Sequence, residues 1–528
     1  MERNTGRGSF LDHHHVAVLG GLVHIEVTLT MDLLKDQHIL ILGLGESGLA
    51  MVRWCLRQSA RVTVVDNRAQ PPGLKQLQTE HPTATFVQDA FHAELVQGND
   101  IRAVFKSPGL SPAEVAGVWQ AALAKGLWCG TELSLFAHAL THLKNSELAY
   151  NPAVLAITGT NGKTTVTRLT GLLLERAGKR VAVAGNIGPT LLDTLGNAWD
   201  ELPEVWVLEL SSFQLDGVDN FEPTAACVLN LTQDHLDWHG DMAAYGAAKA
   251  RIYGQQAVGV LPRQDTSVMA LWPADSSRKK DLPRSRIQFG TDLPQHPGDF
   301  GMATENGMRW LVRAMPSEEV GSKRSRASDE ELHIQRLMPA DALRIRGEHN
   351  ALNALAALAL AGTCCTALAP MLHGLREYSG EPHRLSSVSV VNGVEFIDDS
   401  KGTNVGATVA AVNSLGADRQ LIVILGGDGK GQDFSPLGDP LKRHARAVVL
   451  MGRDAPLLQD ALQVYGLHIH HATDMQHAVD TAVQLAHSGD AVLLSPACAS
   501  LDMYTNYVAR GQAFSDAVQQ LAMLEGQP

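Results

Sequence analysis

The chain has 528 residues, a formal net charge of -13 and 45% hydrophobic residues, enough apolar material for several packed domains. No apolar run approaches the roughly 20 residues that cross a bilayer, and no basic segment is concentrated enough to indicate nucleic-acid binding. Six scattered cysteines without a C-x-x-C pair are typical of reduced thiols, so we expect a cytoplasmic protein.

The first 30 residues differ from the sequence that follows them. Their apolar run is short and interrupted by His24 and Glu26, and no basic segment with a small-residue cleavage site accompanies it, which argues against a signal peptide. The sequence MDLLKDQHILILGLG, from Met31, has the character of a domain start. We therefore expect residues 1–30 to be a poorly ordered extension outside the fold.

Strand-like apolar runs alternate with helical patterns almost throughout the remaining chain, which predicts α/β domains with mostly parallel sheets. Three units stand out, and we place them at residues 31–130, 131–380 and 381–528. Within the second unit, residues 316–332 are polar, mixed in charge and without periodicity, so we predict a surface loop there.

The first unit opens with a glycine-rich turn. Gly43, Gly45 and Gly48 form G-x-G-x-x-G directly after the apolar run HILIL, and Asp66 ends the next strand-like run. This spacing matches the dinucleotide-binding fingerprint. Three interpretations stay open at this point: a nicotinamide cofactor, another diphosphate, or close packing of a strand on a helix.

The second unit opens with another turn, in the sequence AITGTNGKTTVTRL. Gly159, Gly162, Lys163 and Thr164 resemble a phosphate-binding loop, but the usual G-x-x-x-x-G-K-[ST] spacing would need a glycine where Ile157 stands. The alternatives are a shortened nucleotide loop and an ordinary strand-to-helix turn. In the former, the lysine neutralises phosphate charge and the threonine hydroxyl binds Mg²⁺.

Three features follow the second loop along the chain. Glu209 lies inside the apolar run VWVLEL, where a single carboxylate is costly unless it is paired or binds a cation. The run CVLNLTQDHLDWHG is predicted to be a strand that ends in Asp234, His235 and Asp237, and Lys249 falls on a predicted helix. His235 and His239 are four residues apart, but no H-E-x-x-H glutamate supports a zinc pair.

Together, the motifs GTNGKTT, GNIG, LELSSFQL, NLTQDHLDWHG and AAKARIY resemble the Mur ligase family. The later motifs, GEHNALNALAALALA, EPHRL, DDSKGTNVGAT, LGGDGKGQDF and SPACASLDMYTNYVARG, resemble the branch that adds D-glutamate. The resemblance runs from about Met31 to the C-terminus. It implies a Rossmann-like UDP-binding domain, a central P-loop ATPase-like domain with a parallel sheet, and a C-terminal Rossmann-like domain that binds the amino acid.

This resemblance implies a reaction and its participants. ATP would activate the carboxylate of UDP-N-acetylmuramoyl-L-alanine as an acyl phosphate, and D-glutamate would displace phosphate, in peptidoglycan precursor synthesis. Two Mg²⁺ ions and a monomer are expected, with no nucleic acid and no membrane insertion. The alternatives are a sister ligase that adds another amino acid, an NAD-binding oxidoreductase, and a nucleotide sensor that has lost catalysis.

The resemblance also assigns residues, each by its place in a matching motif. The expected catalytic residues are Lys163, Glu209, His235 and Lys249, the last one carbamylated, and the expected metal ligands are Thr164, Glu209, His235 and Lys249. The expected ATP contacts are Gly159, Thr160, Asn161, Gly162, Lys163, Thr164, Thr165, Val166, Asn353, Arg384 and Asp399. The expected UDP-substrate contacts are Glu46, Ser47, Asn67, Arg68, Ser107, Gly109 and Asn186.

The D-glutamate site is expected in the third unit, at Lys401, Thr403, Lys430, Ser500, Leu501 and Tyr507. Across all the expected contacts, the chain departs from the family pattern at two positions: Glu46, a UDP contact, stands where the family often has an apolar residue, and Tyr507 where a phenylalanine is usual. Because the reactants bind to three domains, the third must close on the second, and we expect the hinge at Arg376 to Glu381.

Overall fold

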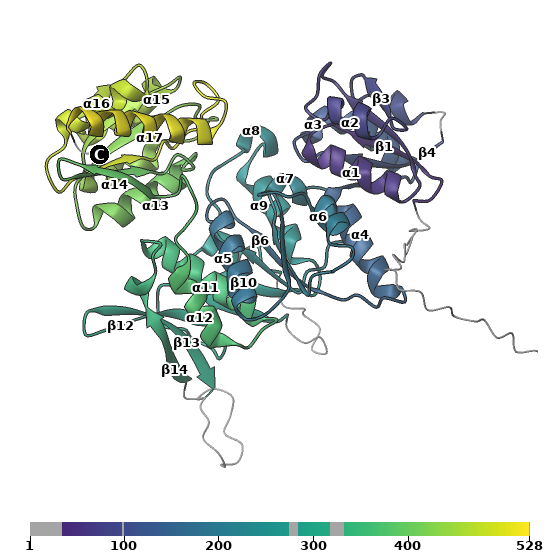
Figure 1. Cartoon of the computed structure of the whole chain (residues 1–528), viewed down its shortest axis with the longest axis horizontal. Helices are drawn as coiled ribbons and strands as arrows, with labels where there is room; N and C mark the ends of the chain where they lie inside the picture. The colour runs from purple at the N-terminus through teal and green to yellow at the C-terminus, as the bar shows by residue number, and fades with distance from the viewer. Residues whose placement is uncertain (1–33, 98–99, 274–283, 317–331, 527–528) are drawn as a thin grey trace, which may run out of the picture.

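The computed structural model describes residues 34–97, 100–273, 284–316 and 332–526 (Figure 1). The extension expected at residues 1–30 and nearly all of the loop expected at 316–332 lie outside the described residues. Within the described ranges, no helix is both long and apolar enough to cross a membrane.

The first domain is a parallel sheet in the order β3-β2-β1-β4-β5, with helices on its two faces. This is a Rossmann-type strand order. The alternation of strand and helix patterns predicted a parallel sheet, and the family resemblance implied a Rossmann-like domain. Its strands are β1 (His38–Leu42), β2 (Arg61–Asp66), β3 (Thr85–Gln88), β4 (Ile101–Lys106) and β5 (Trp128–Thr131). Its helices are α1 (Glu46–Arg57), α2 (Leu74–Glu80), η1 (Ala93–Val96) and α3 (Pro112–Ala124).

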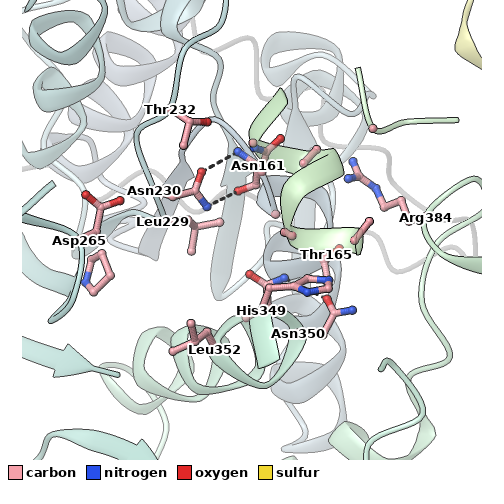
Figure 2. A pocket seen from close by; sticks show the side chains of 18 of the residues that line it. Asn161, Thr165, Leu229, Asn230, Thr232, Asp265, His349, Asn350, Leu352 and Arg384 are labelled. Atoms are coloured by element: carbon pink, nitrogen blue, oxygen red, sulfur yellow. Dashed lines mark hydrogen bonds between the residues drawn. The ribbon is translucent and has the colours of Figure 1, made fainter. Parts of the chain in front are cut away.

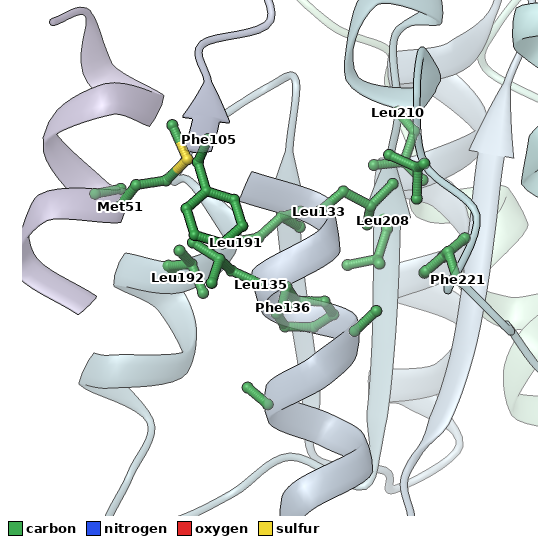
Figure 3. Packing of buried hydrophobic residues seen from close by; sticks show 14 of the residues in the cluster. Met51, Phe105, Leu133, Leu135, Phe136, Leu191, Leu192, Leu208, Leu210 and Phe221 are labelled. Carbon is green, nitrogen blue, oxygen red and sulfur yellow. The ribbon is translucent and has the colours of Figure 1, made fainter. Parts of the chain in front are cut away.

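Helix α4 (Glu132–Asn145) leads from this sheet to the central domain and packs with α1 and with α6 (Leu191–Asn197). Figure 3 shows Met51 and Phe105 of the first domain against Leu191 and Leu192 of the central one. All four side chains belong to one continuous apolar cluster. The burial of this shared cluster holds the two domains together.

The central domain contains a parallel sheet in the order β11-β10-β9-β6-β8-β7. Its strands are β6 (Ala153–Thr158), β7 (Val181–Gly185), β8 (Val205–Glu209), β9 (Ala225–Val228), β10 (Val258–Pro262) and β11 (Arg286–Phe289). Its other helices are α5 (Lys163–Arg176), α7 (Ser212–Leu215), α8 (Leu236–His239), α9 (Met242–Ala250), η2 (Arg251–Tyr253), α10 (Thr266–Met269), α11 (Glu348–Gly362) and α12 (Leu368–Glu377).

One sequence expectation for the central domain was wrong, and one element of it was not anticipated. Strand β9 ends at Val228, and the chain from there to Asp234 and His235 is irregular, because polar residues interrupt the apolar run. A small antiparallel sheet of β12 (Phe300–Glu305), β13 (Met308–Pro316) and β14 (Leu332–Pro339), followed by η3 (Ala340–Ala342), was not expected. Asn306 and Gly307, both at positive φ, form its first turn, as an Asn-Gly hairpin requires.

The C-terminal domain has a sheet in the order β15-β16-β20-β17-β18-β19, parallel except for β15. Its strands are β15 (Ser386–Val391), β16 (Val394–Asp398), β17 (Leu421–Gly426), β18 (Ala445–Met451), β19 (Ile469–His471) and β20 (Ala491–Leu494). Its helices are α13 (Val405–Gly416), η4 (Ser435–Leu437), α14 (Gly438–His444), α15 (Ala455–Leu462), η5 (Gln463–Tyr465), α16 (Met475–Leu485) and α17 (Tyr507–Leu524). The predicted fold class, α/β with three domains, is confirmed.

Candidate active site

The second glycine loop has the strand–loop–helix context of a phosphate-binding loop. Ile157 is fully buried in β6, the chain turns through Gly159 (φ +150) and Gly162 (φ +83), and α5 begins at Lys163. The lysine ammonium donates to the carbonyl oxygens of Gly159 and Thr160, both at 2.9 Å, and so folds back over the loop. The geometry places a cation and the N-terminus of a helix at one point, which suits a phosphate group.

All four expected catalytic residues line one cavity of about 780 Å³ between the central and C-terminal domains. These are Lys163, Glu209, His235 and Lys249. Further expected contacts line the same cavity: Thr160, Asn161, Gly162, Thr164, Asn186, Arg384, Lys401, Thr403 and Tyr507. Residues that are far apart in the sequence therefore converge where the two domains meet.

Glu209 ends strand β8 at the wall of this cavity and is 1% exposed. Its Oε1 accepts a hydrogen bond from the Asn186 side-chain amide (2.8 Å), whereas its buried Oε2 has no hydrogen-bond partner among the described residues. A buried carboxylate oxygen without a partner is costly, which makes this atom a candidate cation ligand.

Lys249 lies on α9 and is 1% exposed. Its Nζ donates to the carbonyl oxygen of Gly159 (3.0 Å) and lies over the ring of Tyr245, 4.5 Å from the centroid. Burial, together with the ammonium of Lys163, holds the pKa of Lys249 well below its ordinary value. A neutral amine is favoured at this position because the site provides no carboxylate partner for a charged one among the described residues.

His235 directly precedes α8 in a left-handed conformation (φ 55) and lies beside the ring of Phe213, at a centroid distance of 4.7 Å. Burial lowers the pKa of His235 to about 4, although Asp234 partly opposes the shift. The imidazole is therefore neutral near pH 7 and can offer a nitrogen lone pair. Among the described residues, no group of three or more His, Cys, Asp or Glu is arranged to hold a metal ion alone.

A second cavity, of about 520 Å³ (Figure 2), adjoins the first, with which it shares Asn161, Gly162, Arg384 and Lys401 as lining residues. Its lining includes the expected ATP contacts Asn161, Gly162, Thr165, Asn353, Arg384 and Asp399. Sequence reasoning missed other lining residues, including Asn230, which exchanges two hydrogen bonds with Asn161, and His349 and Asn350. His349 and Asn350 belong to the motif GEHNALNALAALALA and could have been found there.

Within this second cavity, Asp399 accepts a hydrogen bond from the Ser495 hydroxyl (2.7 Å). Burial raises the pKa of Asp399 to about 7, against the opposing effects of Ser495 and Arg384.

In the first cavity, burial lowers the pKa of Lys401 to about 8, and Arg384 adds to the shift. The Lys401 ammonium lies 4.0 Å from the ring centroid of Tyr507, a cation–π contact that keeps the ring face against the cation.

Direct contacts join the C-terminal side of the site to the glycine loop. The Arg384 guanidinium donates to the Thr164 hydroxyl (2.8 Å), and the side-chain amides of Asn161 and Asn404 exchange hydrogen bonds of 3.1 and 2.9 Å. Asn404 was not predicted, although it lies within the motif DDSKGTNVGAT. The structure therefore brings the third domain against the second at the predicted site.

A third cavity, of about 460 Å³, opens beside the first glycine loop. It is lined by all the expected UDP contacts of the first domain: Glu46, Ser47, Asn67, Arg68, Ser107 and Gly109. The Asp66 carboxylate is fully engaged, because it accepts from the Arg68 guanidinium at 2.8 and 2.7 Å and from two backbone N–H groups. It is therefore not free for the ribose hydroxyls that a nicotinamide nucleotide would present.

Apart from Gly159, four of the expected ATP and D-glutamate contacts line neither the first nor the second cavity. The Val166 side chain is buried in the apolar core, and Lys430 instead forms an ion pair with Asp234 (2.7 Å). Ser500 is buried and Leu501 is 71% exposed.

Tyr245 lines the first cavity but was not predicted. It lies four residues before Lys249, and this helical spacing, which places the two residues on one face, was the available signal.

Three family models match this chain: "Mur ligase MurD-like, N-terminal domain" over residues 37–128, "Mur ligase middle domain" over 157–292, and "Mur ligase, glutamate ligase domain" over 383–498. A protein of Albidiferax ferrireducens named UDP-N-acetylmuramoylalanine--D-glutamate ligase is 61% identical, over 94% of this chain and 98% of its own. A protein of the same name from Burkholderia thailandensis is 52% identical, over 92% and 98%.

Solved structures are similar at the level of the fold. The UDP-N-acetylmuramate-alanine ligase MurC of Thermotoga maritima has a TM-score of 0.51 at 18% identity and covers 92% of this chain and 99% of its own. The MurF ligase of the same organism, in complex with ADP, has a TM-score of 0.53 at 14% identity and covers 93% and 100%.

Proposed function

The chain belongs to the Mur ligase family, and on that premise we propose that it joins D-glutamate to UDP-N-acetylmuramoyl-L-alanine with the hydrolysis of ATP to ADP and phosphate. The main support is the high identity to relatives named for this reaction over nearly the whole of both chains. The cavity that gathers Lys163, Glu209, His235 and Lys249 supplies the groups that the reaction needs.

The chemistry explains why cations dominate the site. A free carboxylate does not react with an amine in water, so one of its oxygens first attacks the γ-phosphorus of ATP. A carbon–oxygen–phosphorus link forms and ADP leaves. The neutral amine of D-glutamate then attacks the acyl carbon, the amide bond forms, phosphate leaves and the amine loses a proton. Two anions meet in the first step, and Lys163 offsets their repulsion at the glycine loop.

The residues present also fit magnesium. The orphaned Glu209 Oε2 and the Thr164 hydroxyl are hard oxygen donors beside the loop, and Mg²⁺ in phosphoryl-transfer sites takes one or two protein ligands together with substrate phosphates. We propose two ions, with His235 and a carbamylated Lys249 contributing to the second. The ions would supply charge neutralisation on the transferred phosphoryl group. Carbamylation would turn a buried amine into an oxygen donor without adding an unpaired cation.

The substrates would span the three domains. The UDP group would occupy the cavity beside the first glycine loop, which is lined by Arg68 and, at the N-terminus of α1, by Gly45 and Ser47. D-Glutamate would lie near Lys401, Thr403 and Tyr507, with its carboxylates toward the lysines of the third domain. We retain the domain limits 31–130, 131–380 and 381–528, and we propose a monomer that acts in the cytoplasm.

A single assay tests the proposal. The protein is incubated with ATP, Mg²⁺, UDP-N-acetylmuramoyl-L-alanine and one amino acid at a time, and phosphate release and the nucleotide product are measured. D-Glutamate should give the fastest release and a product that is heavier by one glutamyl residue. Faster release with L-alanine, a diamino acid or L-glutamate would assign the chain to a different reaction within the family.

A further inference from the structure

The carboxyl group of Glu132 lies where the first and central domains meet. Glu132 is the first residue of α4, is 2% exposed and directly precedes Leu133. Figure 3 shows Leu133 and Leu135 of this helix beside Leu191 and Leu192 of α6, in the apolar cluster that joins the two domains. A carboxyl group in such surroundings lowers stability unless it has a compensating role.

The contacts of this carboxyl group come from two other helices. One oxygen, Oε1, accepts the backbone N–H of Leu192 (3.0 Å) in the first turn of α6. The Ser47 hydroxyl in the first turn of α1 and the N–H of Leu191 also favour its ionised form. The other oxygen, Oε2, has no hydrogen bond of normal geometry among the described residues. The N-terminal ends of α1, α4 and α6 therefore converge on one side chain.

The charged groups nearby leave this carboxyl without a cation. Asp193, on α6, adds negative charge, and its own carboxylate is bound by Arg53 of α1 at 2.9 Å. Arg53 also approaches Glu80 (3.7 Å), and no described residue forms an ion pair with Glu132. Burial raises the pKa of Glu132 to about 7, with the N–H of Leu192 and the Ser47 hydroxyl opposing the shift. The group can therefore change its charge near neutral pH.

The two helices that Glu132 connects carry opposite ends of the proposed substrate site. Ser47 lines the cavity beside the first glycine loop, where the UDP group is proposed to bind. Helix α6 directly follows the loop that contains Asn186, and Asn186 donates to Glu209 (2.8 Å) in the cavity of about 780 Å³ where the reaction is proposed to occur, the reaction cavity. A displacement of α1 relative to α6 would change the distance between these two cavities.

We propose that Glu132 is a positioning residue for the UDP-linked substrate, because it holds the first turn of α1, which carries Ser47, and the loop that contains Asn186 at the spacing that the substrate spans. This inference rests on the proposed function. Ionised Glu132 draws the Ser47 hydroxyl proton toward itself and away from a bound diphosphate, and its charge opposes that of the diphosphate. The protonated or amide form leaves the hydroxyl free to donate to the ligand.

Three variants of the full chain test the inference. Glu132→Ala removes the link, Glu132→Gln keeps its shape and its acceptor for Leu192 but cannot ionise, and Arg53→Gln breaks a different contact across the same junction. Calorimetry measures the binding of UDP-N-acetylmuramoyl-L-alanine alone, and phosphate release gives kcat and the three KM values at pH 6, 7 and 8.

We expect Glu132→Ala to weaken binding of the UDP-linked substrate about 10-fold, with the KM values for ATP and D-glutamate changed less than about 3-fold. Wild-type binding should weaken about 3-fold from pH 6 to 8, while Glu132→Gln should bind equally at both pH values and Arg53→Gln should match the wild type. Glu132→Gln retains the shape of the side chain, so its pH profile decides the matter even if Glu132→Ala does not fold.

Three results would each overturn the inference. Glu132→Ala could bind the UDP-linked substrate as tightly as the wild type does, or it could raise all three KM values equally. Alternatively, binding by Glu132→Gln could depend on pH as binding by the wild type does. The proposed function is tested separately in the same experiment. A wild-type protein that binds the UDP-linked substrate but does not use D-glutamate contradicts the proposed reaction, whereas the binding comparison still decides the role of Glu132. A wild-type protein that does not bind this nucleotide overturns both.

Discussion

The ammonium group of Lys430 lies 2.7 Å from the carboxylate of Asp234, and this ion pair joins the C-terminal domain to the central one. Lys430 follows β17 in a left-handed conformation (φ 50), and Asp234 precedes α8. Burial alone would raise the pKa of Asp234, but the Lys430 ammonium holds it below its ordinary value. The pair therefore places a cation beside the reaction cavity, where a substrate carboxylate could replace its partner.

The variant Lys430→Met should raise the KM for D-glutamate at least about 10-fold, because the substrate loses a charge-assisted hydrogen bond. The KM for ATP should stay within about 3-fold of the wild type. Steady-state phosphate release with one substrate varied at a time measures both values. Lys442→Met, on the exposed side of α14, is the matched control. An unchanged KM for D-glutamate in Lys430→Met would remove this residue from the amino-acid site.

The orphaned oxygen of Glu209 leads to a prediction about magnesium. Glu209→Gln keeps an acceptor for Asn186 but replaces the buried Oε2 with a neutral amide, so kcat should fall at least about 100-fold. The melting temperature without ligands should not fall, because an unpaired buried charge is removed. Mg²⁺ with ADP should raise the melting temperature of Glu209→Gln by less than it raises that of the wild type.

Glu204→Gln is the control for this experiment, since Glu204 lies just before the same strand and pairs with Lys179 at the surface. Melting temperatures measured with ADP alone, and with ADP and Mg²⁺, separate the stabilisation by the metal from the stabilisation by the nucleotide. If Glu209→Gln retained the full magnesium-dependent gain in melting temperature, Glu209 would not be a metal ligand.

Asp399 should make stability depend on pH. Its pKa is about 7 in the folded protein and near 4 in an unfolded chain, so the folded state holds the proton more tightly. The resulting contribution to stability is complete below pH 4 and is lost as the pH rises through 7. Asp399→Asn has no proton to lose and keeps an acceptor for Ser495.

The melting temperature of Asp399→Asn relative to the wild type should therefore rise by a few °C between pH 5 and pH 8, measured without nucleotide. The exposed Asp418→Asn should show no such trend. A relative melting temperature that falls over this range would mean that the carboxyl group of Asp399 is ionised and stabilised in the folded protein.

The fold could be predicted from the sequence wherever a local pattern was sufficient. The alternating strands and helices and the turns at Gly43 and Gly159 gave the parallel sheets, because the period of apolar residues and the position of glycines are properties of short segments. The antiparallel sheet β12-β13-β14 was missed although Asn306-Gly307 marks its first turn. The strand expected to reach Asp234 ends at Val228, because backbone pairing with β6 and β10 stops there.

The candidate site was predicted mostly from the family resemblance, and the structure added the contacts between domains. The pairing of Lys430 with Asp234 and of Asn404 with Asn161 depends on how the third domain meets the second, which no local pattern encodes. Glu132 was missed for the same reason. Its sequence neighbours suggest an ordinary helix start, and only the packing of α1 and α6 against α4 makes its carboxyl group a junction.

Lys249 provides the sharpest test of the proposed chemistry. A carbamate forms when the neutral amine attacks CO₂, a nitrogen–carbon bond is made and the amine loses a proton. The buried position of Lys249, with Gly159 and Tyr245 as its close contacts, favours that neutral amine. Wild-type activity should therefore fall in buffer stripped of CO₂ and return when bicarbonate is added.

Lys249→Ala should lose at least about 100-fold in kcat, and bicarbonate should restore little of it, because no amine remains to be carbamylated. Lys249→Met fills most of the volume of the lysine side chain, so it removes the amine without leaving the cavity that alanine leaves. It should be as inactive as Lys249→Ala, but its melting temperature should be closer to that of the wild type. Intact-protein mass spectrometry at high bicarbonate should show the added CO₂ only in the wild type. Wild-type activity in Lys249→Met, or activity of the wild type that does not depend on CO₂, would refute the carbamate and leave Lys249 as a buried amine that packs against Tyr245.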